Sequence, residues 1–462
     1  MDALLSSGED ILRRIQANNA IDIAEIFLQS SNLLSCSIGT DITSPFRDIT
    51  YSGFAIRIIS SNQLGFASGT FSNVEATLTE ALRNARLSRP LTDVQLPSPV
   101  SDHRKDIPLF DKALLALQID DLLDILQSIE NAGFHNLTNY QSTCDIHRVT
   151  ENYVVMNTND LIAKEKNTWL TAHCLIRQTR EEMEKWGYAE IFTHQFSQED
   201  IFAVGHRALD SVKRHFYRGS ILSDREKLSP PITKSSLIWN HKAMADLLAF
   251  SFVPALSSSV HQNFETKRTQ DTSVPILTQS LSILDDPHIH YGIGSHQIDQ
   301  EGVTTKKRLL VDKGYLSSLL STYLDDAKGG NAYRAQYFSD IQRSFEVYPH
   351  ETPSNLVIDA PELEQKDIFD LPQGFYIQGI VGVHDANAST GEFSVSCSEA
   401  FMIDNGDKIP LKICHISGNI FELLNSVTAV SKHKELVHPV SAPFGIVLPM
   451  LMTEGGFSLL VK

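Results

Sequence analysis

Apolar and polar positions in the first 90 residues predict strands followed by a helix. Gly53–Ile59 and Leu64–Ala67 are two strand-like runs, and the polar stretch Ser60–Gln63 between them is typical of a hairpin turn. Ser72, followed three residues later by Glu75, has the pattern of a capping box, which predicts the start of a helix. The apolar stripe of that helix consists of Val74, Leu78, Ala81, Leu82 and Ala85.

Two further amphipathic helices enclose a strand-rich segment. The first has its apolar stripe at Leu122, Ile125, Leu126 and Ile129, and the second, over Ser197–Phe216, at Ile201, Val204, Ala208, Leu209 and Val212. Between them the content of β-branched and aromatic residues rises, which favours an antiparallel meander. Trp169–Ile176 shows no strict alternation of apolar and polar residues, so we expect this strand to be covered on both faces.

Two segments suit domain boundaries. A connector rich in Pro, Ser and Asp runs from Pro90 to about Pro108, and Leu228–Pro231 is the clearest boundary in the chain. Beyond it, a helix over about Ala243–Leu256 is apolar most of the way round, which indicates burial on several sides. The remainder is rich in strands and turns, with short helices expected near Tyr315–Asp325 and Asn419–Val427.

These elements predict an α+β protein with three domains. We expect an N-terminal α/β region with a hairpin and a capped helix over residues 1–90 and a central α+β domain over 109–222 that contains an antiparallel meander. A larger, β-rich C-terminal domain is expected over 232–462.

The charge of the chain argues against nucleic-acid binding. Lys and Arg total 39 of the 462 residues against 56 Asp and Glu, which gives a formal net charge of -17. A surface this acidic repels phosphate backbones.

The start of the chain lacks the pattern of a signal peptide, and no apolar stretch reaches the roughly 20 residues that span a bilayer. We therefore expect a cytoplasmic protein that binds neither nucleic acid nor membrane.

The cysteines predict no covalent framework. They are odd in number, far apart and without a Cys-x-x-Cys pair, which argues against disulfides and against a thiolate zinc site and fits a reducing compartment. Their positions are Cys36, Cys144, Cys174, Cys397 and Cys414.

Common catalytic signatures are absent from the sequence. It has no Gly-x-Ser-x-Gly nucleophile elbow and no phosphate-binding loop, and Gly292-Ile293-Gly294 lacks the third glycine of a dinucleotide site. A zincin helix needs His-Glu followed one turn later by a second His. Only His350 precedes a glutamate, and Pro353 disfavours a helix there.

Several segments together resemble the TldD/PmbA family, which is also labelled modulator of DNA gyrase. The N-terminal hairpin and helix are similar to the opening domain of that family. The central match begins at Asp285-Asp286-Pro287 and continues through Asp299–Lys306 and Leu310–Leu316 to Gly329–Arg334. A third block consists of Thr390–Ser394, Ile403–Gly406 and Ile416–Asn419. The order and spacing of these pieces over most of the chain carry the resemblance.

The resemblance points to the PmbA-like (TldE) branch. TldD-like chains carry a His-Glu-x-x-x-His helix just behind a Leu-Leu pair, together with a cysteine ligand near the C-terminus. Behind Leu247-Leu248 the metal positions would be Ala249 and Pro254 and the general base Phe250, none of which can do that chemistry. An alternative register begins at His241 and places Lys242 where the glutamate would stand. Glu435–Pro449 also lacks a cysteine.

By resemblance, this chain is expected to be a non-catalytic subunit of a metalloprotease complex. It would pair with a TldD-like catalytic subunit as a heterodimer, or with itself as a homodimer. The complex would carry out proteolysis of unfolded or leader peptides, with zinc in the TldD-like partner and no cofactor in this chain. Alternatives from other classes are a metallopeptidase with an unorthodox metal site of its own and a stand-alone peptide-binding scaffold.

The resemblance also suggests contact residues, but no catalytic residue. Candidates for contact with partner or peptide are Asp299, Glu301, Gly302, Gly330, Asn331, Arg334, Gly391 and Phe393. The competing explanation is that these segments are turns, in which Gly and Asn occupy positions with positive φ. His288 and His290 are weak metal candidates, because they would point the same way if they lay on a strand.

Overall fold

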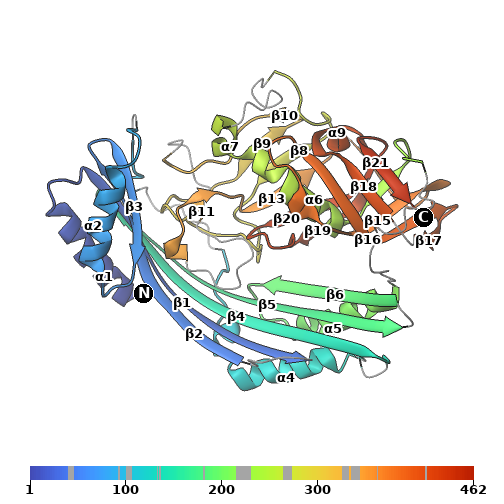
Figure 1. Cartoon of the computed structure of the whole chain (residues 1–462), viewed down its shortest axis with the longest axis horizontal. Helices are drawn as coiled ribbons and strands as arrows, with labels where there is room; N and C mark the ends of the chain where they lie inside the picture. The colour runs from blue at the N-terminus through green and yellow to red at the C-terminus, as the bar shows by residue number, and fades with distance from the viewer. Residues whose placement is uncertain are drawn as a thin grey trace.

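A computed structural model gives the fold of the chain (Figure 1). It describes residues 1–39, 46–91, 94–99, 107–132, 134, 137–180, 183–214, 230–263, 273–324, 332–333, 344–361, 363–411 and 414–461. The fold is α+β, as expected, with one antiparallel sheet in the N-terminal half and a larger mixed sheet in the C-terminal half.

The N-terminal half is built on one six-stranded antiparallel sheet in the order β3-β2-β1-β4-β5-β6. Its strands are β1 (Ile23–Gly39), β2 (Phe46–Ser60), β3 (Gln63–Gly69), β4 (Tyr140–Asn157), β5 (Ile162–Arg180) and β6 (Met183–Thr193). The predicted hairpin is β2–β3, whose two turn residues Ser61 and Asn62 both have positive φ, as a tight hairpin requires. The predicted meander is β4–β5–β6. Strands from residues 1–90 and from 109–222 therefore share one sheet through the β1–β4 pair.

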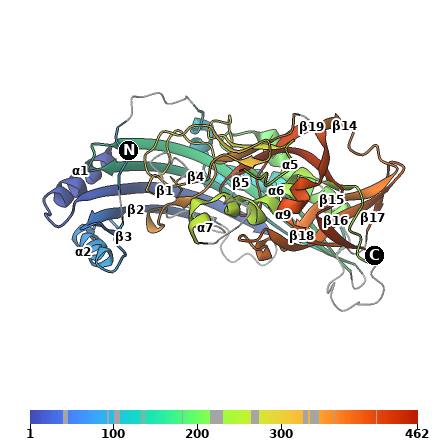
Figure 2. The same ribbon diagram turned by 90° about the horizontal axis from the view of Figure 1, so that it is seen from above.

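Helices cover one face of this sheet. At one end lie α1 (Asp2–Gln16) and α2 (Val74–Ala85), and at the other α3 (Lys112–Ala116), α4 (Ile119–Glu130) and α5 (Gln198–Arg214). The stripes predicted for α2, α4 and α5 are buried against the sheet, apart from Val74 and Leu82, which are partly buried. The opposite face of the sheet is turned toward the C-terminal domain (Figures 1 and 2).

The predicted capping box of α2 is wrong by one residue. The N-cap is Asn73, which makes no side-chain cap bond, while the hydroxyl of Ser72 is 2.9 Å from that of Thr70. Asn is as good an N-cap residue as Ser, so the Ser-x-x-Glu pattern alone could not decide between them.

The C-terminal domain is a mixed sheet packed around helix α6. The main strand order is β10-β9-β8-β13-β20-β7-β15-β16-β18-β21, with β14, β17 and β19 joined to it at the side. Its first strands are β7 (Leu237–Trp239), β8 (Ser282–Asp285), β9 (Arg308–Asp312), β10 (Tyr315–Leu316), β13 (Asn355–Asp359), β14 (Glu364–Lys366) and β15 (Gln373–Val381). The others are β16 (Glu392–Asp404), β17 (Asp407–Pro410), β18 (Cys414–Asn419), β19 (Val427–Val437), β20 (Gly445–Thr453) and β21 (Phe457–Val461). A small separate pair is formed by β11 (Ala332–Tyr333) and β12 (His350–Glu351).

Helix α6 (His241–Ser251) is buried on most sides, as its sequence predicted. It ends at Ser251, and Val253–Leu256 continue as a 3-10 turn that begins next to Pro254. The predicted short helix near 419–427 is α9 (Ile420–Asn425). The helix predicted near 315–325 is wrong, because Tyr315 and Leu316 form β10 and pair with β9 through a two-residue turn at Lys313-Gly314.

One cysteine expectation is wrong as well. The β4–β5 register places Cys144 directly opposite Cys174, and the two sulfurs form a disulfide beneath the helix-covered face. Spacing along the chain could not show this pairing, because it depends on the register of two long strands. Cys36, Cys397 and Cys414 are free thiols.

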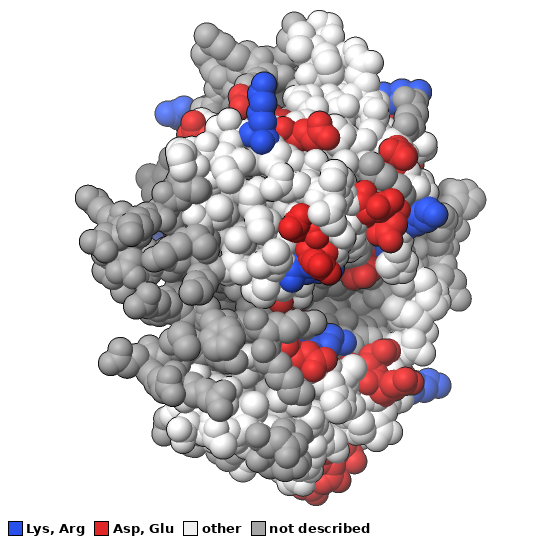
Figure 3. Space-filling model, turned by 90° about the vertical axis from the view of Figure 1, so that its right-hand side faces the viewer, with Lys and Arg blue, Asp and Glu red and all other residues white. Residues whose placement is uncertain are grey.

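No helix in the described part of the chain is long and apolar enough to cross a membrane. On the face shown in Figure 3, acidic side chains are spread with basic ones between them, and the described residues form no broad basic patch there.

Candidate functional site

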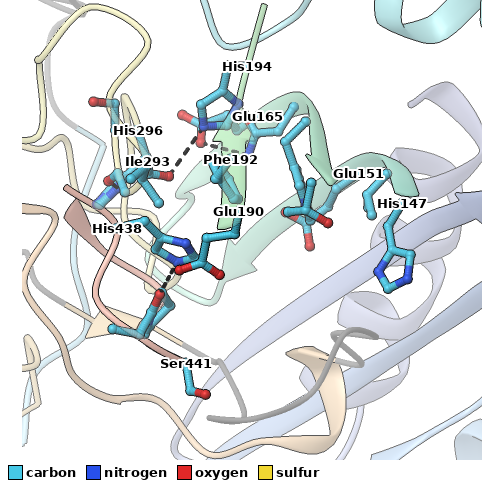
Figure 4. A pocket seen from close by; sticks show the side chains of 18 of the residues that line it. His147, Glu151, Glu165, Glu190, Phe192, His194, Ile293, His296, His438 and Ser441 are labelled. Atoms are coloured by element: carbon cyan, nitrogen blue, oxygen red, sulfur yellow. Dashed lines mark hydrogen bonds between the residues drawn. The ribbon is translucent and has the colours of Figure 1, made fainter. Parts of the chain in front are cut away.

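A cavity of about 390 Å³ lies between the free face of the N-terminal sheet and the C-terminal domain. Strands β4, β5 and β6 supply its floor, and two loops of the C-terminal domain, 293–300 and 438–443, supply its roof. Figure 4 shows Glu151, Glu190 and His147 reaching from the sheet toward this space, with His438 and Ser441 facing them.

Alternation along three neighbouring strands explains why these side chains meet. On β5, Glu165, Asn167, Trp169, Thr171 and His173 face the cavity, whereas Leu170, Ala172, Cys174 and Ile176 face the helices. On β4 the lining residues are His147, Val149, Glu151 and Tyr153, and on β6 they are Tyr188, Glu190, Phe192 and His194. The strand Trp169–Ile176 is thus fully buried on one face only, and its other face is half-buried along the cavity.

Two carboxylates are buried deep in the floor. Glu151 accepts a 2.6 Å hydrogen bond from the side-chain amide of Gln29. Glu165 accepts hydrogen bonds from the Tyr153 hydroxyl at 3.0 Å and from the backbone N–H of Gln297 at 2.6 Å, which ties the roof loop to the sheet. Burial outweighs these hydrogen bonds and raises the pKa of each glutamate to about 7.

Three of the five cavity histidines are held by backbone carbonyl groups. His194 Nδ1 lies 2.8 Å from Thr168 O, His296 Nδ1 lies 2.6 Å from Gly294 O, and His438 Nε2 lies 2.7 Å from Ala442 O. Burial lowers the pKa of all three, that of His296 to about 4, so these imidazoles are neutral at pH 7.

Helix α6 meets the edge of the cavity through Lys242. Its ammonium donates to Glu190 of β6 at 2.9 Å and to the carbonyl oxygen of His438 at 2.7 Å, and it lies 3.2 Å from Asp246. Burial lowers the pKa of Lys242, but the carboxylates of Asp246 and Glu190 outweigh burial, so the pKa is raised. Burial also raises the pKa of Asp246 to about 6. Lys242 is therefore a cation shared between the two halves of the molecule.

Three of the predicted contact residues, Asp299, Glu301 and Gly302, are buried. They lie at a second place where the C-terminal domain meets the N-terminal sheet. Glu301 is fully buried and pairs at 2.5 Å with Arg57, which also pairs with Glu25 at 2.6 Å. Asp299 accepts from the backbone N–H groups of Glu301 and Val303, and this turn gives Gly302 its positive φ. The Arg57–Glu301 pair holds the C-terminal domain onto the sheet, and Asp299 also lines the cavity.

The remaining predicted contact residues divide into two groups. Gly391 and Phe393 are buried at the start of β16, where Phe393 belongs to the C-terminal core. Gly330, Asn331 and Arg334 lie outside the described residues.

The two weak metal candidates are not on a strand. His288 and His290 lie in a turn after β8, so the alternation argument for pairing them does not apply. His288 Nε2 is 3.3 Å from the Thr305 hydroxyl, whereas His290 is exposed and its ring packs edge-on against Tyr291.

Neither register proposed for a zinc helix supplies zinc ligands. Ala249 and Phe250 pack against the C-terminal core, and Pro254 lies beyond the end of α6. The alternative register brings Lys242 and Asp246, rather than Ala249 and Phe250, to the cavity edge. Within the described ranges, no three His, Cys, Asp or Glu side chains are placed to hold one metal ion.

The cavity residues of β4, β5 and β6 were not among the residues predicted from the sequence. The usable signal was a polar or aromatic residue at every second position from Glu165 to His173, with small or apolar residues between them from Thr168 onward. The aromatic and β-branched content of Trp169–Ile176 concealed this alternation.

Comparisons with known proteins agree with this architecture. Residues 233–455 match the family model described as the PmbA/TldA metallopeptidase C-terminal domain. An uncharacterized protein of Methanocaldococcus jannaschii is 24% identical over 93% of this chain and 96% of its own length. A protein of Haemophilus influenzae named metalloprotease TldD homolog is 23% identical over 96% of this chain and 94% of its own length.

The whole fold has a solved counterpart. The crystal structure of TldE from Thermococcus kodakarensis superposes with a TM-score of 0.78 at 21% identity, covering 98% of this chain and 99% of that one. The C-terminal domain of this chain, residues 233–455, therefore belongs to the PmbA/TldA metallopeptidase C-terminal domain family, and the relatives along the whole length and the TldE fold agree with that assignment.

Proposed function

We propose that this chain is the TldE-like, non-catalytic subunit of a TldD-type zinc metalloprotease complex that acts on unfolded or leader peptides. The observation that carries the proposal is the position of Lys242 on α6. His241-Lys242-x-x-x-Asp246 has the spacing of the His-Glu-x-x-x-His zinc motif, and it lies at the edge of the cavity with Lys242 in the place of the glutamate.

The chemistry of these three residues argues against catalysis by this chain. An ammonium group that donates to two carboxylates cannot accept a proton from water, so Lys242 cannot replace a general base. Asp246 is occupied by Lys242 and by the backbone N–H of Val440, and His241 lies against Glu435 at 3.5 Å. A zinc ion would have to displace this ion pair and would then lack the second imidazole of the motif.

The cavity suits a supporting role for an extended peptide. Its floor follows three strands, and its lining combines aromatic rings with carboxylates and neutral imidazoles. Such a lining can hold the side chains of an unfolded segment, whereas a folded domain would be excluded by size.

The test is to purify the chain alone and together with the TldD-like chain of the same genome. We expect a complex by native mass spectrometry, zinc bound only in proportion to the TldD-like chain, and cleavage of an unfolded protein only by the complex. Glu→Gln in the partner's motif should abolish cleavage, whereas His288→Ala with His290→Ala in this chain should leave it nearly unchanged. Stoichiometric zinc and cleavage by this chain alone would overturn the proposal, and so would the lack of any complex.

A further inference from the structure

Apart from Lys242 at its edge, which is already paired with Glu190 and Asp246, the cavity is lined by acidic rather than basic side chains. Glu151, Glu165, Glu190 and Asp299 supply carboxylates, and no Lys or Arg is present among the described residues that line the cavity. A buried carboxylate without a cation is costly, so an acid-lined cavity favours a ligand that brings positive charge.

Most of these carboxylates are already occupied. Glu165 accepts from Tyr153 and Asn167 on one oxygen and from the backbone N–H groups of Gln297 and Ile298 on the other. Glu190 accepts from Lys242 and from the hydroxyl of Tyr188. Glu151 accepts from the side-chain amides of Gln29 and Asn167, and among the described residues its contacts include no cation. Glu151 is therefore the carboxylate with capacity for a ligand.

A second acceptor lies beside Glu151. Asn167 stands directly opposite Glu151 in the β4–β5 register, and its side chain lines the cavity. Asn167 is only 9% exposed, and its Oδ1 has no hydrogen-bond partner within the described structure. Its Nδ2 is directed to the Glu165 carboxylate, so the unpaired end of the amide is the oxygen. A buried acceptor of this kind calls for a donor from outside the chain.

An aromatic wall continues from these two acceptors. Trp169 is two residues beyond Asn167 on the same face of β5, and its ring stacks with that of Phe192 at 6.4 Å between centroids. Such rings pack against the aliphatic stem or the planar head of a long basic side chain.

We propose that this part of the cavity binds a basic side chain of an extended peptide, through an ion pair with Glu151 and a hydrogen bond to Asn167 Oδ1. That the ligand is a peptide rests on the proposed function, whereas the need for a cation with several donors rests on the lining alone. Arginine should bind better than lysine, because its planar fork can reach a carboxylate and an amide oxygen together. Binding should strengthen from pH 6 to pH 8, because only the ionised Glu151 pairs with a cation, and its pKa is about 7.

The test uses the full chain alone, so that it does not depend on pairing or proteolysis. Fluorescence anisotropy would compare short, labelled, unstructured peptides that differ at one residue: arginine, lysine, the neutral isostere citrulline, or glutamate. We expect about tenfold tighter binding for arginine than for citrulline at pH 8. Glu151→Gln should remove this preference, Asn167→Ala should reduce it, and the exposed control Glu9→Gln should retain it.

Two results would overturn the proposed binding site. Equal affinity for the arginine and citrulline peptides in the native chain overturns it, and so does a preference that survives in Glu151→Gln. Asn167→Ala gives a second test if Glu151→Gln does not fold. Free argininamide or spermidine that competes as strongly as the arginine peptide overturns the assignment to a peptide. A chain that binds arginine peptides yet never pairs with a TldD-like subunit would refute the partner role and leave the site intact.

Discussion

Two ionic junctions connect the N-terminal sheet to the C-terminal domain, and they differ in their access to water. At one, Arg57 pairs with Glu25 and Glu301, and the side chains are 2%, 0% and 0% exposed. At the other, Lys242 pairs with Glu190 and Asp246, and the lysine side chain is 35% exposed. At each junction, one cation is shared between a carboxylate of the N-terminal half and a carboxylate of the C-terminal half. The two junctions therefore have the same kind of pairing and differ in their surroundings.

Because their surroundings differ, we expect the two junctions to have different roles. The Arg57 junction adjoins an apolar cluster in which Phe27, Tyr153, Ile298 and Phe345 pack between the halves. The Lys242 junction borders the cavity, where water and ligands have access. A dry ion pair with a planar guanidinium fixes two domains in one arrangement, whereas a half-exposed ammonium can exchange partners.

The largest effect is expected at the dry junction. Arg57→Ala leaves two buried carboxylates unpaired and should lower the free energy of unfolding by about 3–5 kcal/mol. Urea denaturation measures this loss. The exposed pair of Arg14 with Glu75 provides the control, and Arg14→Ala should leave the unfolding midpoint unchanged. Similar losses for the two variants would mean that the buried ion pair of Arg57 stabilises the fold no more than an exposed pair does.

The pH dependence of stability tests the cavity floor. The pKa of Glu151 is about 7 in the fold against 4.5 for an ordinary glutamate, so the folded state holds more protons than the unfolded state between these values. The contribution of Glu151 to stability is therefore highest below pH 4.5 and falls as the pH rises through 7, by about 3 kcal/mol in all.

Glu151→Gln removes this titration. Relative to the native chain, the variant should gain stability as the pH rises from 5 to 8, which denaturation at both values would measure. A stability difference that does not change with pH would mean that Glu151 is ionised throughout and has a cation nearby.

A backbone change at the dry junction should have a smaller effect. Gly302 has φ +81°, and a Cβ there would lie 2.7 Å from Leu161 Cδ2, so Gly302→Ala should cost about 1–3 kcal/mol. Gly382 has a similar φ of +89° with open space around it, so Gly382→Ala reports the backbone strain alone. Equal losses in thermal denaturation would mean that the packing against Leu161 contributes nothing.

The smallest effect is expected at the wet junction. Lys242→Met should cost on the order of 1 kcal/mol at pH 7, because water screens a half-exposed pair. The loss of stability should be less at pH 5. The pKa of Asp246 is about 6 and would rise further without the lysine, so at pH 5 a proton on Asp246 replaces the lost cation. A loss as large as that of Arg57→Ala would show that both junctions are equally rigid.

Sequence periodicity predicted those parts of the fold that depend on near neighbours. The stripes of α4 and α5 and the turn at Ser61-Asn62 are set within a few residues, so a local pattern contains them. The disulfide and the shared sheet depend on the pairing of β1 with β4 and of β4 with β5, which is a matter of distant register.

The same limit applies to the site. Glu301 and Arg57 are 244 positions apart, so a segment that reads as a polar turn is in fact a buried half of an ion pair. Asn167 and Glu151 meet only because β4 and β5 fold back on each other. Their residue types were visible in the sequence, but their partners were not.

The central place of β1 has a consequence for synthesis on the ribosome. Strands β1, β2 and β3 can pair with one another early, yet the other edge of β1 waits for β4, which begins about a hundred residues later at Tyr140. In that interval the unpaired edge of β1 can join wrong partners, because unpaired strand edges seed aggregation. Nascent chains stalled before Tyr140 should therefore depend on chaperones, and those stalled beyond Asn157 should depend on them less.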